Sequence, residues 1–238
     1  MAELLDQVIE SPRACSYLPA ERACLETRVM VDVDPLELEE LLVRGWRRFG
    51  PFYFRPRCAD CNECVSLRVP TSTFELSKSQ RRARRGAEGL RVVIDVPRVD
   101  DERLDLYARW HAMREAHKGW EPSPHDAQSY GLHFAFPHPS AREVAFYEGE
   151  KLVGVGISDE TPRAWSLVFF YYDPELLDRS LGVVNVLVQI EHAQRRGIPH
   201  AYLGYRVMGC ASLAYKARYR PHELLIGRPL ESEIPEWR

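Results

Sequence analysis

The chain has 238 residues, of which 45% are hydrophobic and 28% charged, and its formal net charge is −3. A chain of this size and apolar content buries a substantial core, as one large domain or two small ones. No stretch approaches the ~20 apolar residues of a membrane-spanning helix, and "MAELLDQVIE" lacks the basic start and apolar run of a signal peptide. We therefore expect a soluble cytoplasmic protein with no membrane partner.

The first third of the chain predicts short helices and strands. Residues 35–45 predict a helix, because a proline stands near its start and a glycine at its end. Residues 77–87 predict a short basic helix, since serines suited to capping open it and a glycine lies near its end. Residues 52–55 and 65–74 have the composition of strands and enclose a cysteine-containing loop.

The rest of the chain predicts a mixed α/β fold. Residues 101–118 have the pattern of a long amphipathic helix, and the Pro- and His-rich residues 121–139 predict mainly loop. A hairpin, a strand, a helix and a further strand follow, which is the order of a mixed α/β sheet. The hairpin is expected at residues 143–160, with a tight turn at 148–150, and the strand at residues 164–174. The helix is expected at residues 181–196, with Gly197 ending it, and the further strand at residues 200–206.

The change in pattern after residue 97 divides the chain. Short elements and the cysteine loop lie before Pro97, whereas the long helix and the mixed sheet follow it. The predicted fold class is therefore α/β (α+β), with an N-terminal domain at residues 1–97 and a second domain at residues 98–238.

Positive charge is concentrated in two segments, although the chain as a whole is almost neutral. Residues 44–91 hold twelve Lys or Arg and four acidic residues, a local balance of +8, and residues 192–222 hold six Lys or Arg and no acid. Two segregated basic segments favour contact with phosphates, whereas any single arginine can equally belong to a solvated helix face. The helix residues that we expect to face a polyanion are Arg81, Arg82, Arg84 and Arg85.

Four of the six cysteines form a candidate cluster: Cys15, Cys58, Cys61 and Cys64. In a reducing compartment such a group is a metal site or a set of free thiols rather than a pair of disulfides. Four thiolates suit tetrahedral zinc and also an iron–sulfur cluster. A zinc ribbon normally shows a second Cys-x-x-Cys, which this sequence lacks, so the spacing leaves zinc, a cluster and metal-free thiols open.

Motifs in both halves of the chain resemble one family. They are "CSYLP" (15–19), "RGWRRFGPFYFRPRCADCNECVSLRV" (44–69) with "FELSKSQRR" (74–82), "FFYYDPELLDRSLGVVNVLVQIEHAQRRGIPHAYLGYRV" (169–207) and "YKARYRPHELL" (215–225). In this order they resemble the arginyl-tRNA–protein transferase family, and within it the bacterial aspartate/glutamate leucyltransferases. The resemblance extends over most of residues 13–225 and is weakest at residues 121–140.

The resemblance implies an N-terminal family domain and a C-terminal domain with an acetyltransferase-like (GNAT) fold. It implies an N-degron enzyme that moves an amino acid from aminoacyl-tRNA to the α-amine of proteins beginning with Asp or Glu, which marks them for degradation. In the bacterial branch the amino acid is leucine, from leucyl-tRNA, and in eukaryotic relatives it is arginine, from arginyl-tRNA. In those relatives an N-terminal cysteine set binds an iron–sulfur cluster, and here Leu18 stands at the second position of their N-terminal cysteine pair.

The implied reaction is aminolysis of an ester, for which the amine must be neutral and the tetrahedral oxyanion needs donors. Holding two substrates together supplies up to ~7–11 kcal/mol, so no nucleophile or cofactor is required, and a tRNA hydroxyl can relay protons. We expect catalytic roles for Tyr205, Tyr215 and Lys216. An acidic acceptor side chain needs a cation, for which arginine is best suited. The candidates for substrate binding are Tyr17, Arg47, Arg48, Arg55, Arg57, Arg68, Lys78 and Arg218, with Arg81, Arg82, Arg84 and Arg85 for tRNA.

Two other functions fit parts of the sequence. An acyl-CoA N-acyltransferase shares the implied fold, but its pyrophosphate loop needs a small residue where "RSLGVV" has Val184 and "QRRGIP" has Pro199. A non-catalytic, zinc-dependent nucleic-acid-binding module would use the basic segments and the cysteines, but it leaves the second half of the chain without a role. An aminoacyltransferase accounts for more of the chain than either.

Overall fold

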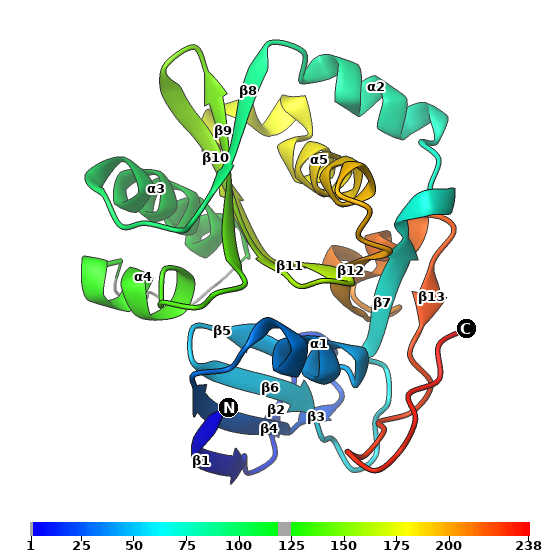
Figure 1. Cartoon of the computed structure of the whole chain (residues 1–238). Coiled ribbons are helices and arrows are strands. Elements are labelled where there is room, and N and C mark those ends of the chain that lie inside the picture. Colours follow the sequence, from blue (N-terminus) through cyan, green and yellow to red (C-terminus); the bar gives the residue numbers. More distant parts are fainter. Residues whose placement is uncertain (1, 119–124) are drawn as a thin grey trace.

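The computed structural model describes residues 2–118 and 125–238, and its largest feature is a mixed sheet (Figure 1). This sheet has seven strands in the order β13-β7-β12-β11-β10-β9-β8. Neighbouring strands are antiparallel except β11 and β12, which are parallel. The expected mixed α/β sheet is thus confirmed. The strands are β7 (Val65–Pro70), β8 (Leu90–Asp95), β9 (Ala141–Glu148), β10 (Lys151–Glu160), β11 (Ala164–Tyr172), β12 (His200–Arg206) and β13 (Glu223–Leu224).

Helices cover both faces of this sheet: α2 (Lys78–Gly86), α3 (Asp101–Lys118), α4 (Ala127–Phe134) and α5 (Leu181–Arg195). Side chains alternate along β9, so Ala145 and Tyr147 pack in one core with α3 and α4, whereas Val144 and Phe146 pack in another with α5. Figure 1 accordingly shows α3 and α4 on one side of the sheet and α5 with α2 on the other. Within the described ranges, no helix is both long and apolar enough to cross a membrane.

The N-terminal part of the chain forms a smaller antiparallel sheet. Its strands, in spatial order, are β1 (Glu3–Ile9), β4 (Leu25–Val31), β6 (Phe52–Pro56) and β5 (Arg47–Phe49). The predicted helix at residues 35–45 is confirmed as α1 (Pro35–Val43), which begins in a capping box between Asp34 and Glu37. Short elements complete the chain: β2 (Arg13–Ala14), β3 (Arg22–Ala23), η1 (Thr71–Thr73), η2 (Pro174–Arg179), α6 (Ala211–Ala214) and η3 (Tyr215–Arg218).

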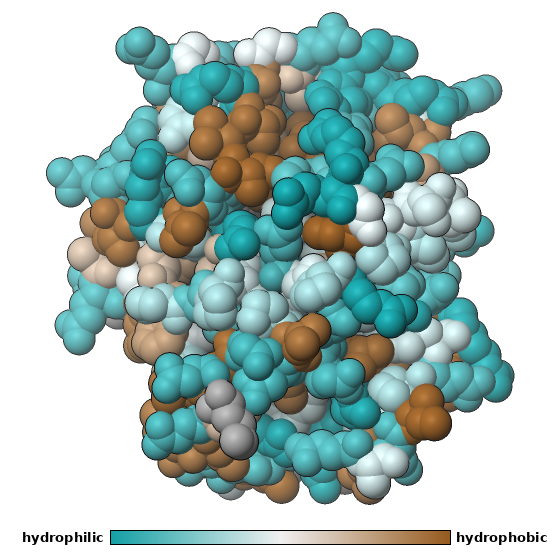
Figure 2. Space-filling view, viewed as in Figure 1, coloured by the Kyte–Doolittle hydropathy of each residue, from teal (hydrophilic) through white to brown (hydrophobic). Residues whose placement is uncertain are grey.

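The sequence did not predict β1, which is an exposed edge strand. Its apolar side chains Leu4, Leu5, Val8 and Ile9 are each about half exposed. Figure 2 shows hydrophobic side chains along the bottom edge of the molecule, where β1 lies, and a further hydrophobic group in the upper part of the same face. Neither face of β1 is buried, so its sequence lacks the alternation that marks a half-buried strand.

Elements that depend on local signals match their predictions. The helix predicted at residues 101–118 is α3, and the strand predicted at residues 200–206 is β12. The capping serine of α2 is Ser77, whose hydroxyl accepts the backbone N–H of Gln80. The strand predicted at residues 65–74 is shorter than expected, because β7 ends at Pro70 and a turn of 3₁₀ helix follows.

The prediction of loop for residues 121–139 is wrong over α4. The side chain of Asp126 accepts a hydrogen bond from the backbone N–H of Ser129 at 2.7 Å and caps this helix. Tyr130 and Phe134 then face the sheet and are buried. The surrounding prolines and histidines hid this short amphipathic pattern, and residues 121–124 lie outside the described residues.

The large sheet draws strands from both sides of Pro97. β7 pairs with β12 from Pro70 opposite His200 to Val65 opposite Arg206. β8 pairs with β9 at the other edge of the sheet. The division of the chain at this residue stays a prediction, and the sheet itself crosses it.

A buried ion pair attaches α3 to the sheet. The side chains of Arg103 and Glu143 are 1% and 3% exposed, and Arg103 Nε donates to Glu143 Oε2 at 2.8 Å. Arg103 Nη1 also donates to Asp100 Oδ2 at 2.7 Å. Removing one partner of a buried pair leaves the other charge uncompensated in the core.

We expect Arg103→Met to lower the free energy of unfolding by about 3–5 kcal/mol at pH 7, because the Glu143 carboxylate loses its partner. Urea denaturation measures the change. Arg98→Met is the matched control, since Arg98 and its partner Asp100 are 57% and 37% exposed and such pairs contribute less than about 1 kcal/mol. Equal losses in the two variants would contradict the structural role of the buried pair.

Candidate active site

A cleft opens where the parallel strands β11 and β12 part. The two strands pair only from Ala164 opposite His200 to Ser166 opposite Tyr202. Beyond these pairs, β11 continues to Tyr172 along a cleft of about 610 Å³. The apolar residues that line this cleft include Leu167, Phe169, Val186 and Leu203. The charged residues that line it are Arg114 and Lys216.

Lys216 of η3 brings an amine of unusual basicity to this cleft. Gly204 lies beside it with a φ of +80°, and a Cβ at that position would lie 3.3 Å from Lys216 Nζ. Glycine is therefore favoured at Gly204 both by its backbone and by the neighbouring ammonium group. Burial, followed by the positive charge of Arg47, lowers the pKa of Lys216 to about 7. An amine with this pKa can accept a proton at neutral pH.

Arg47 is buried next to Lys216 and bridges the two sheets. It lies on β5, and its Nη1 donates to Ser166 Oγ at 2.9 Å while its Nη2 donates to the carbonyl of Leu167. Both partners are neutral and add no counter-charge. Burial lowers the pKa of Arg47, and the guanidinium stays charged because its ordinary pKa is so high. Arg47, predicted to bind substrate, thus lies inside the fold at the base of the cleft.

A basic groove of about 560 Å³ adjoins the cleft on the side of α2. Val183 and Tyr215 line both cavities, which places the cavities next to each other. The cations that line the groove are Arg82, Arg179 and Arg218. The groove also reaches the start of α5 at Ser180 and Val183, where the free N–H groups of a helix favour anions. This combination is suited to phosphate groups.

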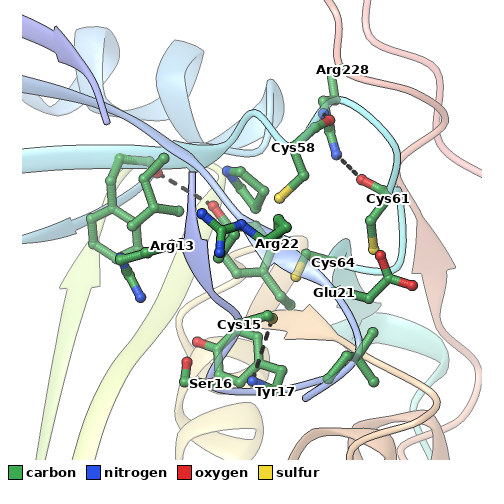
Figure 3. Close-up of a pocket in the computed structure, with 16 residues that line it drawn as sticks. Arg13, Cys15, Ser16, Tyr17, Glu21, Arg22, Cys58, Cys61, Cys64 and Arg228 are labelled. Carbon is green, nitrogen blue, oxygen red and sulfur yellow. Dashed lines mark hydrogen bonds between the residues drawn. The ribbon is translucent and has the colours of Figure 1, made fainter. Parts of the chain in front are cut away.

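The four predicted cysteines line a third cavity of about 70 Å³ (Figure 3). Figure 3 shows that Cys15 comes from the N-terminal segment, whereas Cys58, Cys61 and Cys64 come from the loop between β6 and β7. Arg228 holds this loop by donating to the carbonyls of Cys58 at 2.8 Å and Cys61 at 2.6 Å. The fold therefore brings the N-terminal segment and the cysteine loop to one place.

The spacing of these thiols differs from that of a single-ion site. Among the described residues, no three cysteine sulfurs lie within 4.8 Å of one another, whereas Zn–S bonds of ~2.3 Å would hold them about 3.8 Å apart. An iron–sulfur cluster holds its thiolates farther apart, because each can bind a different iron. Burial, followed by the thiols of Cys58 and Cys15, raises the pKa of Cys64 to about 12. Bound cations would be needed to keep these thiols ionised.

Most of the other predicted substrate-binding arginines are held in ion pairs. Arg48, Arg55 and Arg68 are paired with Asp159, Glu26 and Glu223, with the last two pairs at 2.9 and 2.6 Å. Arg57 is about half exposed and contacts Glu26 at 3.3 Å. These charges are already compensated within the protein.

The predicted tRNA-binding residues lie on the surface of α2. Arg81, Arg82 and Arg85 are exposed, as is Lys78, which was predicted to bind substrate. Arg84 Nε lies 3.2 Å from Glu191 Oε1 of α5. Of the exposed cations on α2, Arg82 lines the basic groove, and Arg218 of η3 lines it too. The structure thus brings together two of the predicted cations, from segments far apart in the sequence.

The predicted tyrosines lie in two places, because Tyr205 and Tyr17 both line the cysteine cavity and Tyr215 lines the cleft. Tyr205 donates its hydroxyl to the carbonyls of Gly45 at 2.8 Å and Phe54 at 3.3 Å, which ties β12 to the smaller sheet. Tyr17 lines the cysteine cavity. Tyr215 lies at the junction of the cleft and the basic groove, where burial raises the pKa of its hydroxyl.

The sequence analysis missed Arg114 and Asn185, which also line the cleft. Gln189 donates to Asn185 Oδ1 at 2.7 Å and accepts a hydrogen bond from Trp165 Nε1 at 2.7 Å. A Cβ at Gly156 would lie 2.5 Å from Asn185 Oδ1, so this contact needs a glycine on β10. Two amides four residues apart in the otherwise apolar residues 181–190 of α5 were the available signal.

Two family models match the chain: "Arginine-tRNA-protein transferase, N terminus" at residues 13–82 and "Arginine-tRNA-protein transferase, C terminus" at residues 102–226. Proteins named aspartate/glutamate leucyltransferase are similar along almost the whole chain. The protein from Helicobacter hepaticus is 32% identical over 226 residues, which cover 94% of each chain. Those from Campylobacter jejuni and Pseudomonas fluorescens are 36% and 34% identical over 90% and 91% of this chain and 90% and 92% of theirs. The chain therefore belongs to the arginine-tRNA-protein transferase family.

Proposed function

We propose that this chain transfers leucine from leucyl-tRNA to the α-amine of proteins that begin with Asp or Glu. The observation that carries the proposal is the cleft containing Lys216, which adjoins the basic groove. The groove suits the phosphates at the 3′ end of a tRNA, and the cleft suits the ester and the attacking amine. Because leucyl-tRNA is made in the cytoplasm, we place the reaction there, and the added leucine marks the acceptor for degradation.

The lining of the cleft favours leucine over arginine as the transferred residue. Leu167, Phe169, Val186 and Leu203 present apolar surface, which suits a branched aliphatic side chain. The charged residues of the lining are cationic, and none of the described residues that line the cleft is acidic. A guanidinium entering this cleft would meet like charge and no carboxylate partner.

The same positive charge suits the acceptor. Arg114 lies over the ring of Trp110, with 5.0 Å between its Cζ and the ring centroid, and contributes its guanidinium to the cleft lining. A planar guanidinium matches the two oxygens of an Asp or Glu side chain. We assign Arg114 to the acidic side chain of the acceptor.

Lys216 is placed to handle the proton that the reaction releases. The acceptor nitrogen attacks the ester carbonyl carbon and forms the new C–N bond, and the C–O bond to the ribose then breaks. Lys216 takes the proton from the attacking nitrogen in its neutral form, and the ribose oxygen leaves as a hydroxyl after protonation. Arg47 acts as a positioning residue, since its charge keeps the pKa of Lys216 low.

The cysteine cavity would hold an iron–sulfur cluster through Cys15, Cys58, Cys61 and Cys64. When bound, the cluster would supply a rigid link between the N-terminal segment and the β6–β7 loop. The chemistry of the transfer needs only the residues of the cleft.

A transfer assay tests the function directly. Peptides beginning with Asp, Glu, Arg or Lys are each offered labelled leucyl-tRNA, arginyl-tRNA or acetyl-CoA. We expect label from leucyl-tRNA on the Asp and Glu peptides alone. Label from arginyl-tRNA on the same peptides would overturn the choice of leucine, and label from acetyl-CoA would overturn the choice of reaction.

Lys216→Met should lower kcat by about 10²–10⁴-fold, the usual contribution of a general base. In the unaltered chain, kcat/KM should fall about tenfold per pH unit where only the acceptor amine is protonated, and about 100-fold per pH unit below pH 7, where Lys216 is protonated as well. The acceptor α-amine has a pKa of ~7.7–8.0, and its protonation causes a separate fall in kcat/KM. This second fall should remain in Lys216→Met. Steady-state kinetics between pH 5.5 and 9 would resolve both falls.

Two controls separate a base from a fixed cation at this position. Lys216→Arg stays protonated, so full activity in that variant would contradict the role of a base. Lys151→Met removes an exposed lysine that pairs with Asp173 away from the cleft, and it should leave kcat unchanged. Because folding lowers the pKa of Lys216 from its ordinary 10.5 to about 7, this residue costs stability that grows as the pH falls from about 10.5 to 7 and is constant below pH 7. Lys216→Met should therefore raise Tm more at pH 6 than at pH 9.

The basic groove should contribute salt-dependent affinity for tRNA. The double change Arg82→Ala and Arg218→Ala should weaken leucyl-tRNA binding and reduce the slope of log K against log salt by about 0.7–0.9 per lost phosphate contact. Fluorescence anisotropy at several salt concentrations measures the slope. Arg238→Ala is the matched control, because this exposed arginine pairs with Glu236 outside the groove. An unchanged slope in the double variant would place the tRNA elsewhere.

A further inference from the structure

Two histidines and a glutamate outside the cleft lie together at the end of α3. His111 and Glu115 are four residues apart, which places them on one face of the helix. His111 Nδ1 lies 2.8 Å from Glu115 Oε1, and His111 is only 5% exposed. Sequence analysis gave no role to either residue, and neither lines the cleft or the basic groove.

His125 reaches this pair from the segment just before α4. Its ring centroid lies 4.4 Å from that of His111, and its Nε2 lies 3.9 Å from Glu115 Oε1. That separation is too long for a hydrogen bond. The other ring nitrogen of His125, Nδ1, is buried and has no hydrogen-bond partner in the described structure. The hydrogen bond between His111 and Glu115 therefore accounts for why these two side chains lie together. It does not account for the buried ring nitrogen of His125 beside them.

We infer that His111, Glu115 and His125 bind a divalent transition-metal ion, with zinc as the best match. The three ligand atoms all lie within 4.8 Å of one another. Two bonds of ~2.0–2.2 Å at a tetrahedral angle hold their ligand atoms about 3.4 Å apart, so the widest pair has to close by about 1.4 Å at most, which a rotation of the partly exposed His125 side chain can supply. Two imidazoles and one carboxylate select zinc or its neighbours over magnesium and calcium, which prefer oxygen. Water would complete a tetrahedral set.

The ion would act as a clamp between α3 and the segment that leads into α4. The ring of Tyr107 connects this site to the cleft, with centroids 5.3 Å from His125 and 6.3 Å from Phe169. Glu115 also follows Arg114, the residue that we assign to the acceptor carboxylate. The clamp would therefore hold one wall of the cleft in place, a role that rests on the proposed function, whereas the binding site itself does not.

Cobalt(II) titration of the full-length chain tests the site with a spectroscopic readout that needs no activity. Cobalt bound by nitrogen and oxygen gives weak visible bands, whereas cobalt bound by the cysteines would add intense thiolate bands in the near ultraviolet. We expect one equivalent with the weak bands alone, and zinc should displace it. His125→Asn should weaken this binding by about 100-fold or more, since even an indirect ligand contact is worth 10–100-fold.

His117→Asn is the matched control, because His117 is an exposed residue of the same helix. It should bind cobalt with unchanged affinity. His125 lies near the surface, with 22% of its side chain exposed, so its variant should fold, and its circular dichroism spectrum checks this. Zinc should also raise Tm in the unaltered chain and not in His125→Asn. No nitrogen–oxygen bands at 100 μM cobalt, or equal binding in the two variants, would overturn the site even if leucine transfer is confirmed.

Discussion

The buried guanidinium of Arg47 joins the two sheets at the point where the cleft begins. It extends from β5 to Ser166, the last residue of β11 paired with β12, and to the carbonyl of Leu167 just beyond. A carbonyl that leaves a β-ladder inside a protein needs a new donor, and Arg47 supplies it. The same charge lowers the pKa of Lys216. The packing of the sheets thus sets the protonation of the group that we place in catalysis.

Local signals predicted much of the fold, and non-local pairing accounts for what they missed. The long helix α3 and the strand β12 were readable because periodicity and end signals lie within each segment. The placement of β7 beside β12 was not readable, since it depends on residues more than a hundred positions apart. β1 is exposed on both faces, and α4 depends on the single cap Asp126, so neither produced a strong pattern.

Charge could be counted from the sequence, but its pairing could not. Arg48, Arg55 and Arg68 looked like substrate ligands because they lie in a basic segment, yet their partners come from distant segments. The sequence shows that Lys216 is a cation, but it does not show the surroundings of this residue. The burial of Lys216, followed by the charge of Arg47, lowers its pKa to about 7 and so allows it to act as a base. Arg82 of the groove was predicted more directly, because it lies on the exposed face of α2. Arg179, which also lines the groove, was not predicted.

The parting of β11 and β12 also explains how two large substrates can meet. The basic groove lies on the side of α2 and α5, whereas Arg114 belongs to α3 on the opposite side of the sheet (Figure 1). An opening between strands connects these two sides, which a continuous ladder would separate. The tRNA end can then enter from one side and the acidic N-terminus from the other. Lys216 lies on the lining of that opening, so the proposed proton acceptor and the meeting point of the two substrates coincide.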